Sequence, residues 1–290
     1  MVCGHPSAIL KKMPFIVIIL TLLSVAPAQK VTFSPASEVV VLQQAGDAPA
    51  RNRERAARMK ALFADSGCDA ARLKEQPSGV SQNSEQPQAQ LEAPNIICEL
   101  PGESTRVILV GAHYESALSM ESPADNWRTA TLLPSLLESL RVRSRTHTIV
   151  FVAFADRGNE PAGAEFFAAH MSPAELGRVD AMVNLDSLGF SPTKVWTSHS
   201  DKELVHALVK AMYAIKLPGS QIDIDAAAGP SDSQPFATRN IPQITVHSLT
   251  QAHLHGELSR EFRPDNFYDS YRLLCAYLAF LDKSLKPRTH

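Results

Sequence analysis

The chain has 290 residues, of which 44% are hydrophobic and 20% are charged, with a formal net charge of −2 at pH 7 and an isoelectric point near 6.6. This composition excludes an intrinsically disordered chain and a collagen-like repeat. The near-neutral charge gives no electrostatic reason to expect nucleic acid or an anionic membrane as a partner.

The first 28 residues are typical of a secretory signal. The basic pair Lys11–Lys12 precedes an apolar run, 15–25, and the small residues Ala26-Pro27-Ala28 follow it. This order of a basic, an apolar and a small-residue region is that of a cleavable secretory signal peptide. The apolar run is shorter than the roughly 20 apolar residues that span a bilayer. We therefore predict a signal peptide over 1–28. The mature chain, 29–290, is predicted to be one domain without an integral membrane segment, secreted or periplasmic.

Before residue 95 the chain has one clear helical pattern. Residues 51–66 place apolar side chains at helical spacing beneath a charged face, which predicts a helix. The stretch 76–92 is rich in Gln, Ser and Pro, and we predict an exposed loop within the same domain.

From Asn95 onward, apolar strands alternate with amphipathic helices. The first two strands are separated by the turn Pro101–Gly102, and we predict that they are neighbours. Strands with near-continuous apolar runs are covered on both faces, so the fold class is α/β: a three-layer, mostly parallel mixed sheet with helices on both faces. The predicted strands are 95–100, 106–111, 148–154, 181–185, 194–197 and 243–246, and the predicted helices are 132–140, 162–169, 203–214 and 268–281.

Cleavage of the predicted signal peptide would remove Cys3 and leave three cysteines in the mature chain. A bridge between Cys68 and Cys98 would close a loop of about 30 residues and stabilise the fold by about 3–4 kcal/mol, and an exported chain tolerates disulfides. The alternative is three unpaired buried thiols. Cys275 lies within an apolar helical pattern and is predicted to be a packed free thiol.

Chemically active residues follow several predicted strands directly. His113, the pair Asp156–Arg157 and Asp186 each come just after a strand, where ligands gather in folds of this class. Asp125 lies 12 residues after His113, before a predicted helix. On its own it has two readings, a helix N-cap or a metal ligand, and imidazoles with carboxylates are the donors that zinc uses.

The region from Asn95 to Asp282 resembles the secreted co-catalytic zinc exopeptidases that include bacterial leucyl aminopeptidases and glutaminyl cyclases, metallopeptidase family twenty-eight. Several ordered blocks at matching spacings carry the resemblance. They are Val110-Gly111-Ala112-His113-Tyr114, Asp125-Asn126-Trp127, Phe151-Val152-Ala153-Phe154, Val183-Asn184-Leu185-Asp186, Ser231-Asp232 with Pro235-Phe236, and Ile241-Pro242.

The resemblance implies a zinc site and an aminopeptidase that acts on the N-termini of peptides or proteins. By position, His113 matches the imidazole ligand of the first metal, Asp125 the carboxylate that bridges both metals, and Asp186 the second ligand of the first metal.

The same resemblance implies an imidazole ligand of the second metal late in the chain. His255 is the best match, and His253 and His247 are the alternatives.

The chain departs from the family where two adjacent Glu residues follow the strand ending at Phe154. One of them is the family's general base and the other a ligand of the second metal. Arg157 and Gly158 stand in their places, while Asp156 and Glu160 are the nearest substitutes. One zinc ion is therefore expected rather than two. Arg157 either pairs with Asp125 or Asp186, or it points to solvent.

Smaller departures lie nearby. Glu115 replaces the Asp of the family's His-x-Asp motif, the pair Arg128–Thr129 replaces Ser-Gly at a helix start, and Ser233 replaces a His. Three functions follow: a metallo-aminopeptidase with a degraded site, a non-catalytic pseudoenzyme that binds peptides, or a glutaminyl-cyclase-like acyl transferase.

Overall fold

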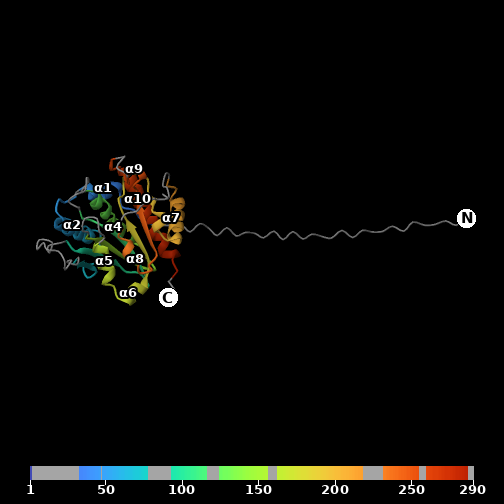
Figure 1. The fold of residues 1–290 in the computed structure, drawn as a ribbon, viewed down its shortest axis with the longest axis horizontal. Helices are drawn as coiled ribbons and strands as arrows, with labels where there is room; N and C mark the ends of the chain where they lie inside the picture. The colour runs from blue at the N-terminus through green and yellow to red at the C-terminus, as the bar shows by residue number, and fades with distance from the viewer. Residues whose placement is uncertain are drawn as a thin grey trace.

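A computed structural model describes Met1 and residues 33–46, 48–77, 93–115, 124–155, 162–217, 231–254 and 259–286. These residues fold around a seven-stranded sheet of order β1-β2-β4-β3-β5-β7-β6 (Figure 1). The four central strands, β4, β3, β5 and β7, are parallel, and antiparallel pairs complete both edges. The predicted mixed α/β sheet is thus confirmed. The strands are β1 (Leu73–Gln76), β2 (Asn95–Leu100), β3 (Val107–His113), β4 (Thr148–Phe154), β5 (Val179–Leu185), β6 (Lys194–Val195) and β7 (Gln243–His247).

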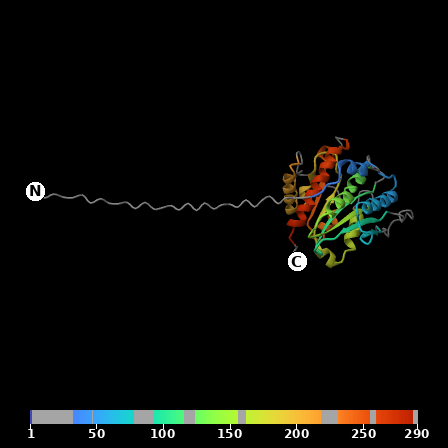
Figure 2. The same ribbon diagram turned by 180° about the vertical axis from the view of Figure 1, so that it is seen from behind.

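Helices cover both faces of the sheet (Figures 1 and 2). One face packs against α1 (Glu38–Gly46), α2 (Asn52–Asp65), α3 (Ala124–Ala130), α4 (Leu132–Arg141), α7 (Lys202–Ile215) and α10 (Pro264–Ser284). The other packs against α5 (Ala162–Ala169), α6 (Pro173–Arg178) and α8 (Gln234–Ala237). A short 3-10 turn, Thr197–His199, and α9 (Gln251–Leu254) complete the elements. Within the described ranges, no helix has the length and apolar character needed to cross a bilayer.

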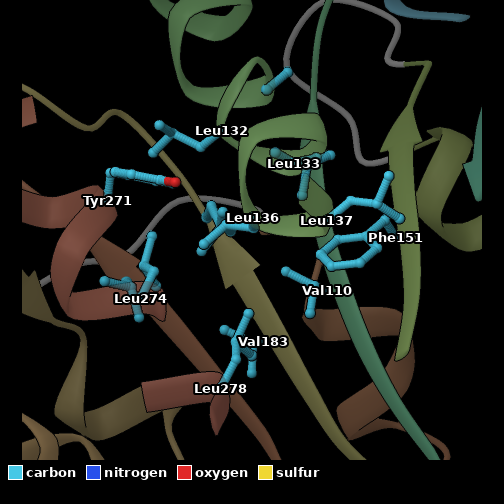
Figure 3. Close-up of a cluster of buried hydrophobic side chains, with 14 of the residues drawn as sticks. Val110, Leu132, Leu133, Leu136, Leu137, Phe151, Val183, Tyr271, Leu274 and Leu278 are labelled. Carbon is cyan, nitrogen blue, oxygen red and sulfur yellow. The ribbon is translucent and has the colours of Figure 1, made fainter. Parts of the chain in front are cut away.

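The larger core lies between α4, α10 and the central strands. Figure 3 shows leucines of α4 and α10 meeting strand residues, and all of the labelled side chains are buried. Each large apolar side chain buried here contributes about 1.5–3 kcal/mol. Because α3 directly precedes α4, this packing also fixes α3 beside the end of β3. The labelled residues are Val110, Leu132, Leu133, Leu136, Leu137, Phe151, Val183, Tyr271, Leu274 and Leu278.

The prediction that the first two strands after residue 95 are neighbours is wrong, because β4 lies between β2 and β3. The connection between β2 and β3 passes across the start of β4, where the Glu103 N–H donates to the Arg145 carbonyl (2.9 Å). Gly102 permits this crossing, since a Cβ there would lie 2.3 Å from the His147 carbonyl carbon.

Cys68 and Cys98 form a disulfide with a Cα–Cα distance of 6.2 Å, so of the two alternatives for these cysteines the bridged one is found. It ties the turn after α2 to the middle of β2. Cys275 is a buried free thiol in α10, as predicted, and burial raises its pKa to about 12.

A buried charge cluster lies at the edge of the sheet where the parallel strands begin. Asp282, in the last turn of α10, accepts hydrogen bonds from the backbone N–H groups of Thr146 (3.1 Å) and His147 (2.7 Å). The His147 ring lies between Asp282 (Nδ1–Oδ1 3.3 Å) and Asp180 (Nε2–Oδ2 3.4 Å). Arg106 binds Asp180 from the other side through two hydrogen bonds. The cluster therefore joins α10 to the starts of three strands.

This cluster predicts a pH-dependent stability. Burial opposes charge on His147, but the hydrogen bond and charge of Asp282, with the charge of Asp180, outweigh it and raise the pKa of His147 above its ordinary value of about 6.5. A raised folded-state pKa stabilises the fold below pH 6.5 or so, and that stabilisation is lost as the pH rises through the folded value. Urea unfolding of the native chain and of His147→Gln should show a stability difference that shrinks with rising pH. A difference that stays constant with pH would contradict this prediction.

Candidate functional site

The carboxyl ends of the parallel strands bring three predicted ligands to one edge. Gly111 of β3 lies opposite Asn184 of β5. His113, the last residue of β3, and Asp186, the residue after β5, are each two residues further on and therefore lie at the same level. The first turn of α3, which packs on β3, carries Asp125. The other candidate residues, Asp156, Arg157, Gly158, Glu160 and His255, lie outside the described residues, and their roles stay predictions.

His113 has a carboxylate partner that the sequence analysis missed. Its Nδ1 lies 2.9 Å from Oδ2 of Asp232, whose side chain is 2% exposed. An imidazole that donates its Nδ1 proton to a carboxylate is fixed in orientation and keeps its lone pair on Nε2. This is the arrangement that orients metal-binding and catalytic histidines.

Buried hydroxyl groups hold the segment that carries Asp232. Asn184 donates to the Ser231 hydroxyl (3.0 Å), and Thr245 Oγ1 lies 3.1 Å from Ser231 Oγ and 3.0 Å from Ser233 Oγ. Ser233, which replaces the family's His, is thus part of the support for Asp232. A buried hydrogen-bond network of this kind restricts the motion of the segment that carries Asp232.

Glu115 has a different partner from the one its motif position implies. Glu115 is buried, and its charge acts on Arg55 of α2: burial lowers the pKa of Arg55, and the nearby Glu115 carboxylate partly offsets that shift. Arg55 also donates to the carbonyls of Pro49 (2.8 Å) and Tyr114 (3.0 Å). The end of β3 is therefore anchored to α2.

Asp125 is almost completely buried, with 1% of its surface exposed. Its Oδ1 accepts a hydrogen bond from Nη1 of Arg128 at 3.2 Å. The Arg128 guanidinium carbon lies 4.5 Å from the centre of the Phe262 ring. Asp125 is therefore in an ion pair within its own helix.

Asp186 accepts a hydrogen bond from the Ser187 hydroxyl (2.8 Å). Ser187 has a φ of 45°, a left-handed conformation that non-glycine residues adopt mainly at strained sites. The next residue, Leu188, donates its N–H to the Thr129 hydroxyl (3.0 Å). Thr129, which replaces the family's Gly, thereby ties α3 to the loop that carries Asp186.

The two alternative late histidines are held by backbone donors. Nδ1 of His247 accepts the Leu249 N–H (3.1 Å), and Nδ1 of His253 accepts the Thr250 N–H (3.1 Å). A ring nitrogen that accepts carries no proton, so the proton lies on Nε2, which then has no lone pair for a metal. Burial and the nearby cations lower the pKa of His253, in agreement with a neutral ring. His255 remains the predicted ligand.

The described residues alone do not fit a zinc ion. Across these ranges, no three His, Cys, Asp or Glu side chains lie close enough together to hold a metal. Oδ1 of Asp125, one of its two possible donor atoms, is bound to Arg128. The assignment of His113, Asp125 and Asp186 as ligands stays a prediction.

The fold of this chain is similar to that of several solved structures. The chain is similar to BSAP, a zinc aminopeptidase from Bacillus subtilis, with TM-score 0.56 and 20% identity, over 66% of this chain and 51% of that one. It thus spans about half the length of that relative. It is also similar to the glutaminyl cyclase of an Acidobacteriales bacterium (TM-score 0.68, 20% identity, 89% and 98% covered). A third similar structure is the LapA aminopeptidase of Legionella pneumophila (TM-score 0.62, 16% identity, 86% and 71% covered).

Residues 95–271 match Peptidase family M28, and the chain belongs to this family. The resemblance carried by the sequence blocks is therefore confirmed. No curated protein sequence matches the chain significantly.

Proposed function

We propose that this chain is an exported member of family M28 that keeps a fold for binding peptide N-termini while ordinary aminopeptidase turnover is severely impaired. One observation carries the proposal: Arg157 and Gly158 stand where the family has its two adjacent Glu residues. Arg stays protonated at any working pH and cannot act as a base, and Gly has no side chain. General base catalysis contributes about 10²–10⁴-fold, so a loss of that order is expected.

Two features support export. The first 28 residues have the order of a secretory signal. The Cys68–Cys98 disulfide is a bond that forms and persists in oxidising compartments. Immunoblotting of cell fractions should find the processed chain outside the cytoplasm.

A working metallo-aminopeptidase is the second candidate. The His113–Asp232 pair favours it, because metal-binding histidines are commonly oriented by a carboxylate on the second ring nitrogen. In that case Asp156 or Glu160 would supply the base. Glutaminyl-cyclase-like acyl transfer is the third candidate, and the fold similarity along nearly the whole length of such an enzyme favours it.

Three measurements on purified mature protein separate these functions: zinc content, hydrolysis of leucyl-p-nitroanilide with and without chelator, and cyclisation of an N-terminal glutaminyl peptide. We expect no chelator-sensitive hydrolysis and no cyclisation, and we expect that the chain still binds a leucyl peptide when binding is measured by isothermal titration calorimetry. Chelator-sensitive hydrolysis at ordinary aminopeptidase rates would refute the proposal in favour of the second candidate, and cyclisation would refute it in favour of the third.

Restoring the two acids tests the same proposal from the opposite direction. The double variant Arg157→Glu/Gly158→Glu is expected to gain hydrolysis of leucyl-p-nitroanilide, since it returns both carboxylates. Arg178→Glu, on the exposed face of α6, controls for added negative charge and should gain none. If the native chain already matched the double variant, the two positions would not limit turnover.

A further inference from the structure

An arginine of the chain itself neutralises the most deeply buried carboxylate of the site. Ion pairs between residues three apart on an exposed helix contribute little. The Arg128–Asp125 pair differs from such pairs, because the Asp125 side chain is 1% exposed and the Arg128 side chain 24% exposed. A buried carboxylate needs a counter-charge, and removal of one partner of a buried pair is strongly destabilising.

The Arg128 guanidinium is also held from outside its helix. The Phe262 ring packs against it at 4.5 Å, a cation–π distance, and the same ring contacts Phe267 of α10, with centroids 5.3 Å apart. Gly189, in the loop after Asp186, leaves room for the ring, since a Cβ there would lie 2.8 Å from it. The contacts thus run from that loop through Phe262 and Arg128 to Asp125.

We propose that the Arg128 guanidinium, clamped between Asp125 and Phe262, is the resident cation of Asp125 and replaces the metal that this position would otherwise hold. Arg suits the role because it is planar, always charged and weakly hydrated. The sequence left two alternatives for Arg157, pairing with Asp125 or Asp186 or pointing to solvent, and Arg157 lies outside the described residues. At Asp125 the pairing arginine is Arg128.

This inference rests on the proposed function and extends it by naming the group that keeps a metal from Asp125. It is tested by thermal stability and zinc affinity and not by peptide hydrolysis. The variants are Arg128→Ser, which returns the family's residue, and Phe262→Leu, which keeps apolar bulk but removes the ring. Arg260→Ser removes an exposed charge near the site and is the matched control. Thermal unfolding is measured in chelator and with zinc chloride, and zinc affinity is measured by equilibrium dialysis.

In chelator, Arg128→Ser should unfold at a lower temperature than the native chain, and zinc should raise its midpoint again. It should bind zinc at least about tenfold more tightly than the native chain, because a repelling charge beside the carboxylate is gone. Phe262→Leu should show the same changes in smaller measure, and Arg260→Ser should behave as the native chain. Equal zinc affinity in the native chain and Arg128→Ser would overturn the inference.

A second comparison covers the case in which Arg128→Ser does not fold. Asp125→Asn leaves Arg128 without its carboxylate, and Asp125→Asn/Arg128→Gln removes both charges together. The double variant should unfold at a higher temperature than Asp125→Asn, and an equal or lower midpoint would overturn the inference. A failed turnover proposal would instead appear as peptide hydrolysis by the native chain, so the two failures are distinguishable.

Discussion

Replacement of Cys68 and Cys98 together by serine is expected to lower the free energy of unfolding by about 3–4 kcal/mol. The bridge joins residues 30 apart and restricts the unfolded chain, which is the main source of its stabilisation in the loop-entropy model. It also fastens the turn after α2 to β2, next to the strand from which residues 156–161 depart. Guanidinium unfolding of the oxidised native chain and of the double variant measures the difference.

The native chain in reductant is the control for this experiment. Its unfolding midpoint should fall to that of the serine variant, because the reductant opens the same bridge that the variant lacks. Cys275 is a buried free thiol and is the same in both samples. If reduction left the midpoint of the native chain unchanged, the bridge would contribute nothing to stability, whatever the variant did.

The elements that the sequence predicts best are those with their own apolar signal. The predicted segments 148–154 and 162–169 coincide with β4 and α5, because both are apolar runs that face cores. The strand β1 was not predicted, since Leu73-Lys74-Glu75-Gln76 has no strand pattern and pairs with β2 through its backbone. The local sequence pattern of a strand does not say which strand lies beside it. The sequence therefore did not predict that β4 lies between β2 and β3.

In the candidate site, too, the sequence predicts which residues are present but not which residues they contact. The sequence names His113 and Asp125 as candidate ligands because strand ends and motif blocks are local features, and their role as ligands stays a prediction. Asp232 is 119 residues from His113, so only the folded chain reveals the pair. Arg128 was visible as a departure from the family, yet its role depends on Phe262, which arrives from a distant loop.

The other large effect is expected at Asn95, which is completely buried at the start of β2. Its Oδ1 accepts the Ala155 N–H (2.8 Å), and its Nδ2 donates to the Gly163 carbonyl (3.0 Å) and to Gln76 Oε1 (2.9 Å). Asn95→Ala leaves two buried backbone groups without this partner. At about 1–3 kcal/mol each, the free energy of unfolding should fall by about 2–6 kcal/mol in a urea titration.

Glycine substitutions test the same junction sterically. Alanine normally stabilises a helix by about 1 kcal/mol relative to glycine. Gly163→Ala should do the opposite, because its Cβ would lie 2.0 Å from the Ala155 carbonyl oxygen. Gly46→Ala, in the last turn of α1 with nothing within 4 Å of its Cβ, is the control and should leave stability unchanged or raise it by up to about 1 kcal/mol. A neutral Gly163→Ala would show that α5 can move away from β4.

These contacts matter for the proposed function because Ala155 and Gly163 flank the segment with Arg157 and Gly158, the positions at which the resemblance implies two acids. Adding Asn95→Ala to Arg157→Glu/Gly158→Glu is therefore expected to remove most of the hydrolysis that the acids restore, at a temperature where circular dichroism shows the chain folded. Catalytic groups tolerate misplacement of only about 1 Å before rates fall 10²-fold. Undiminished hydrolysis would mean that the segment takes its position from contacts other than Asn95.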